Sequence, residues 1–173
     1  MTDELVGTLR IAGTVNDSIV DGPGIRFSIY VQGCPHGCEG CHNPQTWDFQ
    51  GGYDIQIKEL YNSIIANPLL DGVTFSGGEP FCHAKKLALL GKKLRELKLN
   101  IVTYTGYTFE QLMKLGNDNN GFKELLAVTD ILVDGRFELG LKDLTLKFRG
   151  SSNQRIIDVQ ASLETGRAVL CDI

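Results

Sequence analysis

Three closely spaced cysteines constrain this chain more than any other feature. Cys34, Cys38 and Cys41 occupy a segment of the form C-x3-C-x2-C, which is too short for a helix or strand and therefore predicts a loop. Thiolates that converge in one loop are soft ligands that favour zinc or iron–sulfur sites. A [4Fe–4S] cluster has four irons and normally takes four cysteines, so three thiolates would leave one iron open to a substrate or cofactor.

Three kinds of site are compatible with these cysteines. The first is a structural zinc site completed by His42 or by the distant Cys82. The second is a disulfide with one free thiol, which we disfavour because nothing else in the chain is typical of a secreted protein. The third is a [4Fe–4S] cluster with one open iron. Ligand preferences favour the cluster over zinc, and the cysteines alone leave both open.

Composition and charge exclude several classes of protein. The chain has 173 residues, 42% of them apolar, which is enough for the core of a single domain spanning residues 1–173. Its formal net charge of −4 argues against general nucleic-acid binding, which needs a basic face. No apolar run approaches the ~20 residues of a membrane span, and the acidic start, Met1–Glu4, lacks the order of a signal peptide. We therefore expect a cytoplasmic protein that binds neither nucleic acid nor membrane.

Hydrophobic periodicity predicts strands that alternate with helices between residues 26 and 134. This alternation indicates βα units with a parallel sheet and right-handed crossovers. Four such units are too few for a closed barrel of roughly 250 residues, so we predict an α/β fold built as an open partial (βα) barrel with a mostly parallel sheet. The tail, 137–173, is less regular.

The expected elements can be given as residue ranges. The main strands are 9–15, 26–31, 72–76, 100–104 and 130–133, and in the tail we expect strands 154–159 and 168–170 around a turn at 164–166. The expected helices are 54–67, 83–97, 108–115 and 122–128, with Asp54 and Thr108 as N-caps of the first and third.

Each central strand is followed by a polar or glycine-rich loop. The four loops are the cysteine segment, Ser76–Pro80, Tyr104–Tyr107 and Val133–Arg136. In parallel α/β folds, sites form at the carboxyl ends of the strands. The four loops therefore predict one shared site beside the metal.

These motifs resemble a known family. The cysteine spacing followed by Gly77-Gly78-Glu79 resembles the radical S-adenosylmethionine (radical SAM) superfamily. Together with Asp21-Gly-Pro-Gly-Ile-Arg, Gly33–Trp47 and Phe148-Arg-Gly-Ser-Ser-Asn-Gln-Arg-Ile, it resembles the activating proteins of anaerobic ribonucleoside-triphosphate reductase. The resemblance runs from about residue 9 to the C-terminus. The segment 148–156 selects this subgroup.

The resemblance implies cofactors and the residues that hold them. Cys34, Cys38 and Cys41 would each bind one iron of a [4Fe–4S] cluster, and the amino and carboxylate groups of S-adenosyl-L-methionine (SAM) would bind the fourth. Cys82 and Cys171 would not be ligands. The residues implied at SAM are Gly40, Cys41 and His42 near the adenine, Ser76, Gly77, Gly78 and Glu79 near the methionine, and Asp134 at the ribose hydroxyls.

Several assignments stay open at this point. Similar enzymes usually carry an aromatic residue just before the third cysteine, where this chain has Gly40, so the adenine contact would fall to backbone or to His42. Asp134 is equally consistent with a turn aspartate. His36 is expected only to shape the loop, and His83 to be solvated. Arg26, Asn153 and Arg155 look typical of the family, without a role that the sequence reveals.

The resemblance also implies an activity. A reduced cluster would cleave SAM, and the 5′-deoxyadenosyl radical would take a hydrogen atom from a glycine Cα of the large subunit of anaerobic ribonucleoside-triphosphate reductase. The chain would then be a radical SAM oxidoreductase that activates a glycyl-radical enzyme, with an electron donor such as flavodoxin as a second partner. Two rivals remain: a small-molecule radical SAM enzyme of deazaguanine type, which would not need segment 148–156, and a non-catalytic zinc module.

Overall fold

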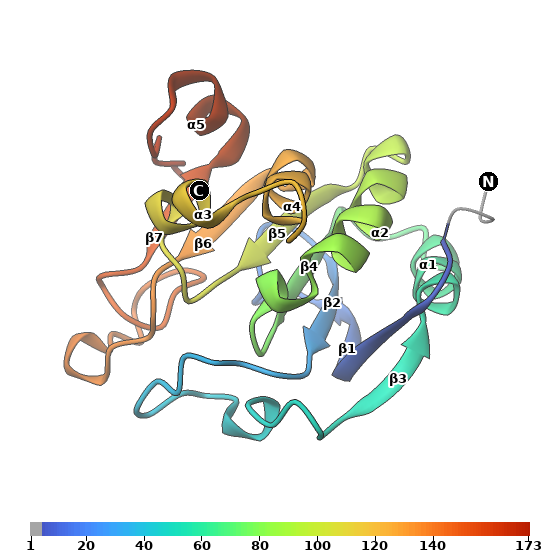
Figure 1. Ribbon diagram of the computed structural model, residues 1–173, viewed down its shortest axis with the longest axis horizontal. Coiled ribbons are helices and arrows are strands. Elements are labelled where there is room, and N and C mark those ends of the chain that lie inside the picture. Colours follow the sequence, from blue (N-terminus) through green and yellow to red (C-terminus); the bar gives the residue numbers. More distant parts are fainter. Residues whose placement is uncertain (1–4) are drawn as a thin grey trace.

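In residues 5–173, which the computed structural model describes, seven strands form one sheet in the order β3-β1-β2-β4-β5-β6-β7 (Figure 1). Strands β2, β4, β5 and β6 pair in parallel. Strands β1, β3 and β7 pair antiparallel at the two sides, so the described sheet is open, with β3 and β7 as its edges. The predicted α/β class and mostly parallel sheet are confirmed. The acidic start, Met1–Glu4, lies outside the described residues.

The strands are β1 (Thr8–Ser18), β2 (Arg26–Val31), β3 (Tyr53–Gln56), β4 (Gly72–Gly77), β5 (Asn100–Tyr104), β6 (Ile131–Asp134) and β7 (Arg155–Asp158). The helices are α1 (Ile57–Ile65), α2 (Ala84–Glu96), α3 (Phe109–Leu115), α4 (Phe122–Val128) and α5 (Val159–Thr165), with 3-10 turns at Pro44–Thr46, Pro80–His83 and Leu139–Leu141. Strands β2 and β5 and helix α4 have the predicted bounds. Thr108 caps α3 in a capping box, as predicted. No helix among the described residues is long and apolar enough to cross a membrane.

The prediction that a helix starts at Asp54 was wrong. Residues 53–56 form strand β3, which pairs with β1, and Asp54 lies opposite Arg10 and forms an ion pair with it at 3.3 Å. Helix α1 begins only at Ile57, after Gln56 as its N-cap. The pairing of β3 joins residues that are distant in sequence, so local periodicity could not reveal it. Strand β1 likewise runs three residues further than predicted, to Ser18.

The tail also differs from the prediction of two strands around a turn. Strand β7 forms, but residues 159–165 are helix α5, which Asp158 caps by accepting a hydrogen bond from the Ala161 backbone N–H. Gly166 ends the helix in the left-handed conformation that favours glycine. Leu170 makes only an isolated bridge with Ile157.

The two faces of the sheet are chemically different because side chains alternate along each strand. The central strands follow each other in chain order, so right-handed crossovers put the helices on one face, where α2 and α4 lie side by side (Figure 1). This face holds the larger apolar cluster, which includes Phe27, Ile29, Val73, Phe75 and Leu132. The other face carries polar residues on β2 and β4 and a smaller apolar cluster made by Val102, Ile131, Val133 and Ile156.

Arg26 organises the polar face. The side chain is fully buried and donates to the carbonyls of Pro23, Val73 and Asn100 at 2.8–3.0 Å and to the Thr74 hydroxyl at 2.7 Å. Burial lowers the pKa of Arg26 to about 10, which leaves it charged at neutral pH. One guanidinium thus joins the starts of β2, β4 and β5 to the loop before β2.

Replacing Arg26 with Met should destabilise the fold. The substitution keeps an apolar chain of similar reach but leaves several buried carbonyls without donors, which should lower the free energy of unfolding by about 2–5 kcal/mol. Urea denaturation measures this quantity. Arg167→Met, at an exposed position, is the matched control and should change the value by less than about 0.5 kcal/mol. Equal effects of the two substitutions would contradict the role of Arg26.

Candidate functional site

The cysteine segment leaves the carboxyl end of β2 and is held to the turn that follows it. The backbone N–H of Gly33 donates to the Thr46 carbonyl at 2.6 Å, and that of Cys34 donates to the Trp47 carbonyl at 3.1 Å. Gly37 and Gly40 have φ of 60° and 75°, which lets the chain fold back between the cysteines. All three cysteines are half-buried and unbridged, as a metal site requires and a disulfide does not.

The backbone N–H of Asn43 donates a hydrogen bond to the Cys41 sulfur at 3.4 Å. Burial raises the pKa of Cys34 to about 11 and also raises that of Cys38. Both groups are thiols without a bound cation, so metal binding must displace their protons.

The donor set suits an iron–sulfur cluster. In residues 5–173, no three His, Cys, Asp or Glu side chains converge closely enough to hold one metal ion. In an iron–sulfur cluster each thiolate binds a different iron, and an N–H···S hydrogen bond such as that from Asn43 to Cys41 is typical of such sites.

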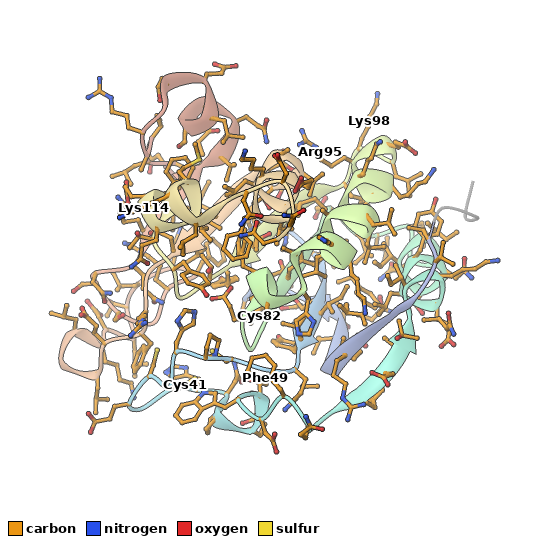
Figure 2. All side chains as sticks on the ribbon, in the orientation of Figure 1. Cys41, Phe49, Cys82, Arg95, Lys98 and Lys114 are labelled. Atoms are coloured by element: carbon orange, nitrogen blue, oxygen red, sulfur yellow. The ribbon has the colours of Figure 1, made fainter. Side chains whose placement is uncertain are left out.

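A cavity of about 500 Å³ opens beside the cysteines, within the range of small-molecule sites. The loops at the carboxyl ends of the parallel strands line it, together with the segment before β2. Figure 2 shows Cys41 on the segment after β2, and Arg95 and Lys98 near the end of α2 on the opposite side of the molecule. Among the predicted site residues, those that line the cavity are Cys34, Cys38, Cys41, His42, Ser76, Gly77 and Gly78.

The Gly-Gly-Glu segment packs against the cysteine segment through its backbone. The N–H groups of Gly78 and Glu79 donate to the carbonyls of Val31 and Gly33, both at 2.8 Å. A Cβ added to Gly78 would lie 2.4 Å from the Gly33 carbonyl oxygen, so only glycine permits this approach. The Glu79 carboxylate is fully buried and does not line the cavity. Any contact between Glu79 and a ligand in the cavity would therefore come from its backbone.

Asp134 is not among the residues that line the cavity, and its carboxylate has partners elsewhere. Its carboxylate is 1% exposed, accepts the Phe109 backbone N–H at 2.8 Å and pairs with Arg155 at 2.5 Å. Hydrogen bonds from Arg155 to Asp134, and then to Glu110, raise the pKa of Arg155. The structure therefore favours the turn alternative, in which Asp134 joins β6 to the start of α3 and to β7.

Gly40 lies just outside the cavity lining, and its surroundings explain why it is a glycine. A Cβ at Gly40 would lie 2.8 Å from the Leu139 side chain, and φ there is positive. The aromatic ring comes instead from Phe137, which lines the cavity and lies 5.2 Å from the His42 ring. The loop after β6 thus fills the place that an aromatic residue before the third cysteine would take.

The prediction that His83 is solvated was wrong. Its Nε2 lies 2.7 Å from the Gln32 carbonyl, and burial lowers its pKa. Cys82 is exposed, and Cys171 packs on the smaller apolar cluster.

Sequence analysis missed several residues of the cavity. Asp21 lines it, and its Oδ2 accepts hydrogen bonds from Ser18, Ser28 and Tyr30 at 2.5–2.9 Å. Burial is the main cause that raises the pKa of Tyr30 to about 12, and the hydrogen bond to Asp21 is the second cause. The Asp-Gly-Pro-Gly motif was the signal for this group, although the sequence indicated only a turn there.

Arg149 was missed as well. Among the described residues that line the cavity, it is the only arginine or lysine. It donates to the Gln154 carbonyl at 3.2 Å, whereas its buried Nε has no hydrogen-bond partner. The preceding residue, Phe148, has φ of 58°, which is strained for a side chain of this size. The motif at 148–156 was the signal, but the sequence could not show that it folds over the cavity.

Comparisons with known proteins agree with the class of site that this geometry defines. Residues 20–157 match the family described as "4Fe-4S single cluster domain". The chain is 34% identical over 149 residues to the anaerobic ribonucleoside-triphosphate reductase-activating protein of Pasteurella multocida, covering 80% of this chain and 90% of the relative. The proteins of the same name from Escherichia coli K12 and Salmonella typhimurium are 35% and 37% identical to this chain over 147 residues. Each of these alignments covers 79% of this chain and 90% of the relative.

The chain therefore belongs to the 4Fe-4S single cluster domain family and to the family of anaerobic ribonucleoside-triphosphate reductase-activating proteins. Among solved structures, the crystal structure of QueE from Escherichia coli aligns with this chain over 58% of this chain and 53% of the QueE chain. The TM-score is 0.46 at 20% sequence identity, a likeness too distant to define a fold.

Replacing Gly78 with Ala should impair cluster binding. Its Cβ would push on the Gly33 carbonyl and move the start of the cysteine segment, so we expect at least a several-fold loss of iron per chain. Iron and sulfide analysis after anaerobic reconstitution measures this. Gly140→Ala is the matched control, since nothing lies within 4 Å of an added Cβ there. Full iron content in Gly78→Ala would show that the close approach is dispensable.

Proposed function

We propose that this chain activates the large subunit of anaerobic ribonucleoside-triphosphate reductase by generating a glycyl radical on it. The observation that carries the proposal is the set of three half-buried thiols that line a 500 Å³ cavity. The relatives at about 35% identity carry the name of this activity. When bound, a [4Fe–4S] cluster with SAM supplies one-electron reductive cleavage and a carbon radical that can remove a hydrogen atom from a glycine Cα.

The residues of the chain would bind and orient these groups. Cys34, Cys38 and Cys41 would hold three irons, and the Asn43 N–H would stabilise negative charge on the Cys41 sulfur. The backbone at Ser76–Gly78 would approach the methionine closely, because two glycines leave no side chain in the way. Aromatic side chains of the lining would exclude water from the reacting atoms. Hydrogen abstraction needs no general acid or base, so none is assigned.

The partner assignments extend this proposal. The cavity lies at the carboxyl ends of the parallel strands of an open sheet, which we interpret as the partial barrel of a radical SAM enzyme. An opening there would let a glycine-bearing segment of the reductase reach the cofactor. A one-electron donor such as flavodoxin would reduce the cluster, and the reaction would take place in the cytoplasm.

Two rival functions predict different results. A small-molecule radical SAM enzyme of deazaguanine type would convert a free pterin with no reductase present. A zinc module would purify anaerobically as a colourless protein with stoichiometric zinc. Membership in the two families favours the activase over both.

Replacing Cys38 with Ala should abolish activation. With two thiolates left, the cluster should not be held in the form that binds SAM, so glycyl-radical formation should fall below detection. Electron paramagnetic resonance (EPR) of the reductase after anaerobic incubation with reductant and SAM measures the radical. Cys171→Ala removes a cysteine that is not among the residues lining the cavity and should leave the signal unchanged. A full radical signal with Cys38→Ala would refute the proposal.

Arg149 should bind the carboxylate of SAM. Its guanidinium is the one Arg or Lys charge among the described lining residues, and its Nε lacks a partner. Loss of one charge-assisted hydrogen bond costs about 1.5–3 kcal/mol, so Arg149→Met should weaken SAM binding ~10–100-fold. Decarboxylated SAM should bind the variant and the unaltered protein alike. Calorimetry on the reconstituted proteins measures both, and equal losses for the two ligands would contradict the assignment.

A further inference from the structure

Glu79 is the centre of a buried hydrogen-bond cluster that joins three loops. Its Oε1 accepts from the Gly106 backbone N–H at 2.8 Å and lies 2.5 Å from His36 Nε2. The Thr105 hydroxyl and the Phe81 backbone N–H complete the cluster at 2.9 Å. The carboxylate is fully buried, and these donors satisfy both oxygens. The cluster connects the cysteine segment to the loops after β4 and β5.

The His36 ring has little freedom to move. Its side chain is 4% exposed, and the Tyr107 ring packs edge-on against it with centroids 4.7 Å apart. A Cβ added to Gly106 would lie 2.4 Å from His36 Cδ2, so the ring rests directly on the backbone of the loop after β5. Glu79, Gly106 and Tyr107 thus hold this ring on three sides.

The position of the ring fixes the backbone of the same residue. His36 lies between Cys34 and Cys38, two residues from each, so its backbone belongs to the segment that carries two of the cluster ligands. Hydrogen bonds to the sulfurs and solvent exposure help to set the reduction potential of an iron–sulfur cluster. A change at the His36 ring should therefore reach the cluster through the backbone between these two cysteines.

We infer that His36, held by Glu79, is a positioning residue that sets the reduction potential of the cluster. The inference rests on the proposed function, because it requires the cluster to be present. It assigns Glu79 a supporting role behind the cysteine segment, instead of a contact with SAM through its carboxylate. Neither role could be seen in the sequence, where His36 and Glu79 lie 43 residues apart.

The test is a redox titration of the reconstituted protein, followed by EPR of the reduced cluster without SAM or reductase. His36→Ala should shift the midpoint potential and change the EPR spectrum, because the backbone between Cys34 and Cys38 loses the ring that holds it. His36→Gln should restore most of the potential, since its amide N–H can occupy the place of Nε2. Gly106→Ala keeps every hydrogen-bonding group but displaces the ring, so it should shift the potential in the same direction.

His83→Ala is the matched control. It removes another half-buried ring, bound to the Gln32 carbonyl and not to Glu79, and should leave the potential unchanged. If His36→Ala holds no cluster, Gly106→Ala decides the outcome. Unshifted potentials in the variants that hold the cluster would overturn the inference and leave the activase proposal intact. If the unaltered protein itself assembles no cluster, the proposed function fails.

Discussion

The site depends on the parallel pairing of β2 with β4. In this register Val31 lies opposite Gly77, so the two strands end at the same level. The backbone hydrogen bonds continue past both strands, from Gly78 to Val31 and from Glu79 to Gly33. The cysteine segment and the Gly-Gly-Glu segment therefore leave the sheet as a paired unit, and glycine at residue 78 is what permits the close approach. A shift of register would separate the thiols from the cavity.

The asymmetry of the sheet follows from the same strands. On one face of the sheet, apolar side chains pack against the helices. The other face therefore can carry polar groups. Arg26 and Asp21 satisfy those groups with hydrogen bonds to backbone and hydroxyls, and Asp21 also lines the cavity. Glu79 joins the loops in a similar way, because its partners come from the loop after β4, the loop after β5 and the cysteine segment.

Local signals in the sequence predicted much of this arrangement. Strand and helix periodicity located β2, β5 and α4, and the loops after successive strands indicated one shared site. Contacts between distant residues were beyond those signals. Asp54 fits an N-cap in sequence but pairs with Arg10 across two strands. The spacing of a motif does not show which way a carboxylate turns, so Glu79 and Asp134 were both assigned to the cofactor, whereas each is buried against other loops.

The most direct test of the account is reductive cleavage of SAM by the isolated chain. The protein would be reconstituted anaerobically with iron and sulfide, reduced, supplied with SAM and assayed for 5′-deoxyadenosine. We expect a brown protein that forms 5′-deoxyadenosine and methionine in equal amounts without the reductase, because the cluster and the cavity belong to this chain. A protein that holds no iron and binds zinc tightly, with no 5′-deoxyadenosine formed, would contradict the central claim.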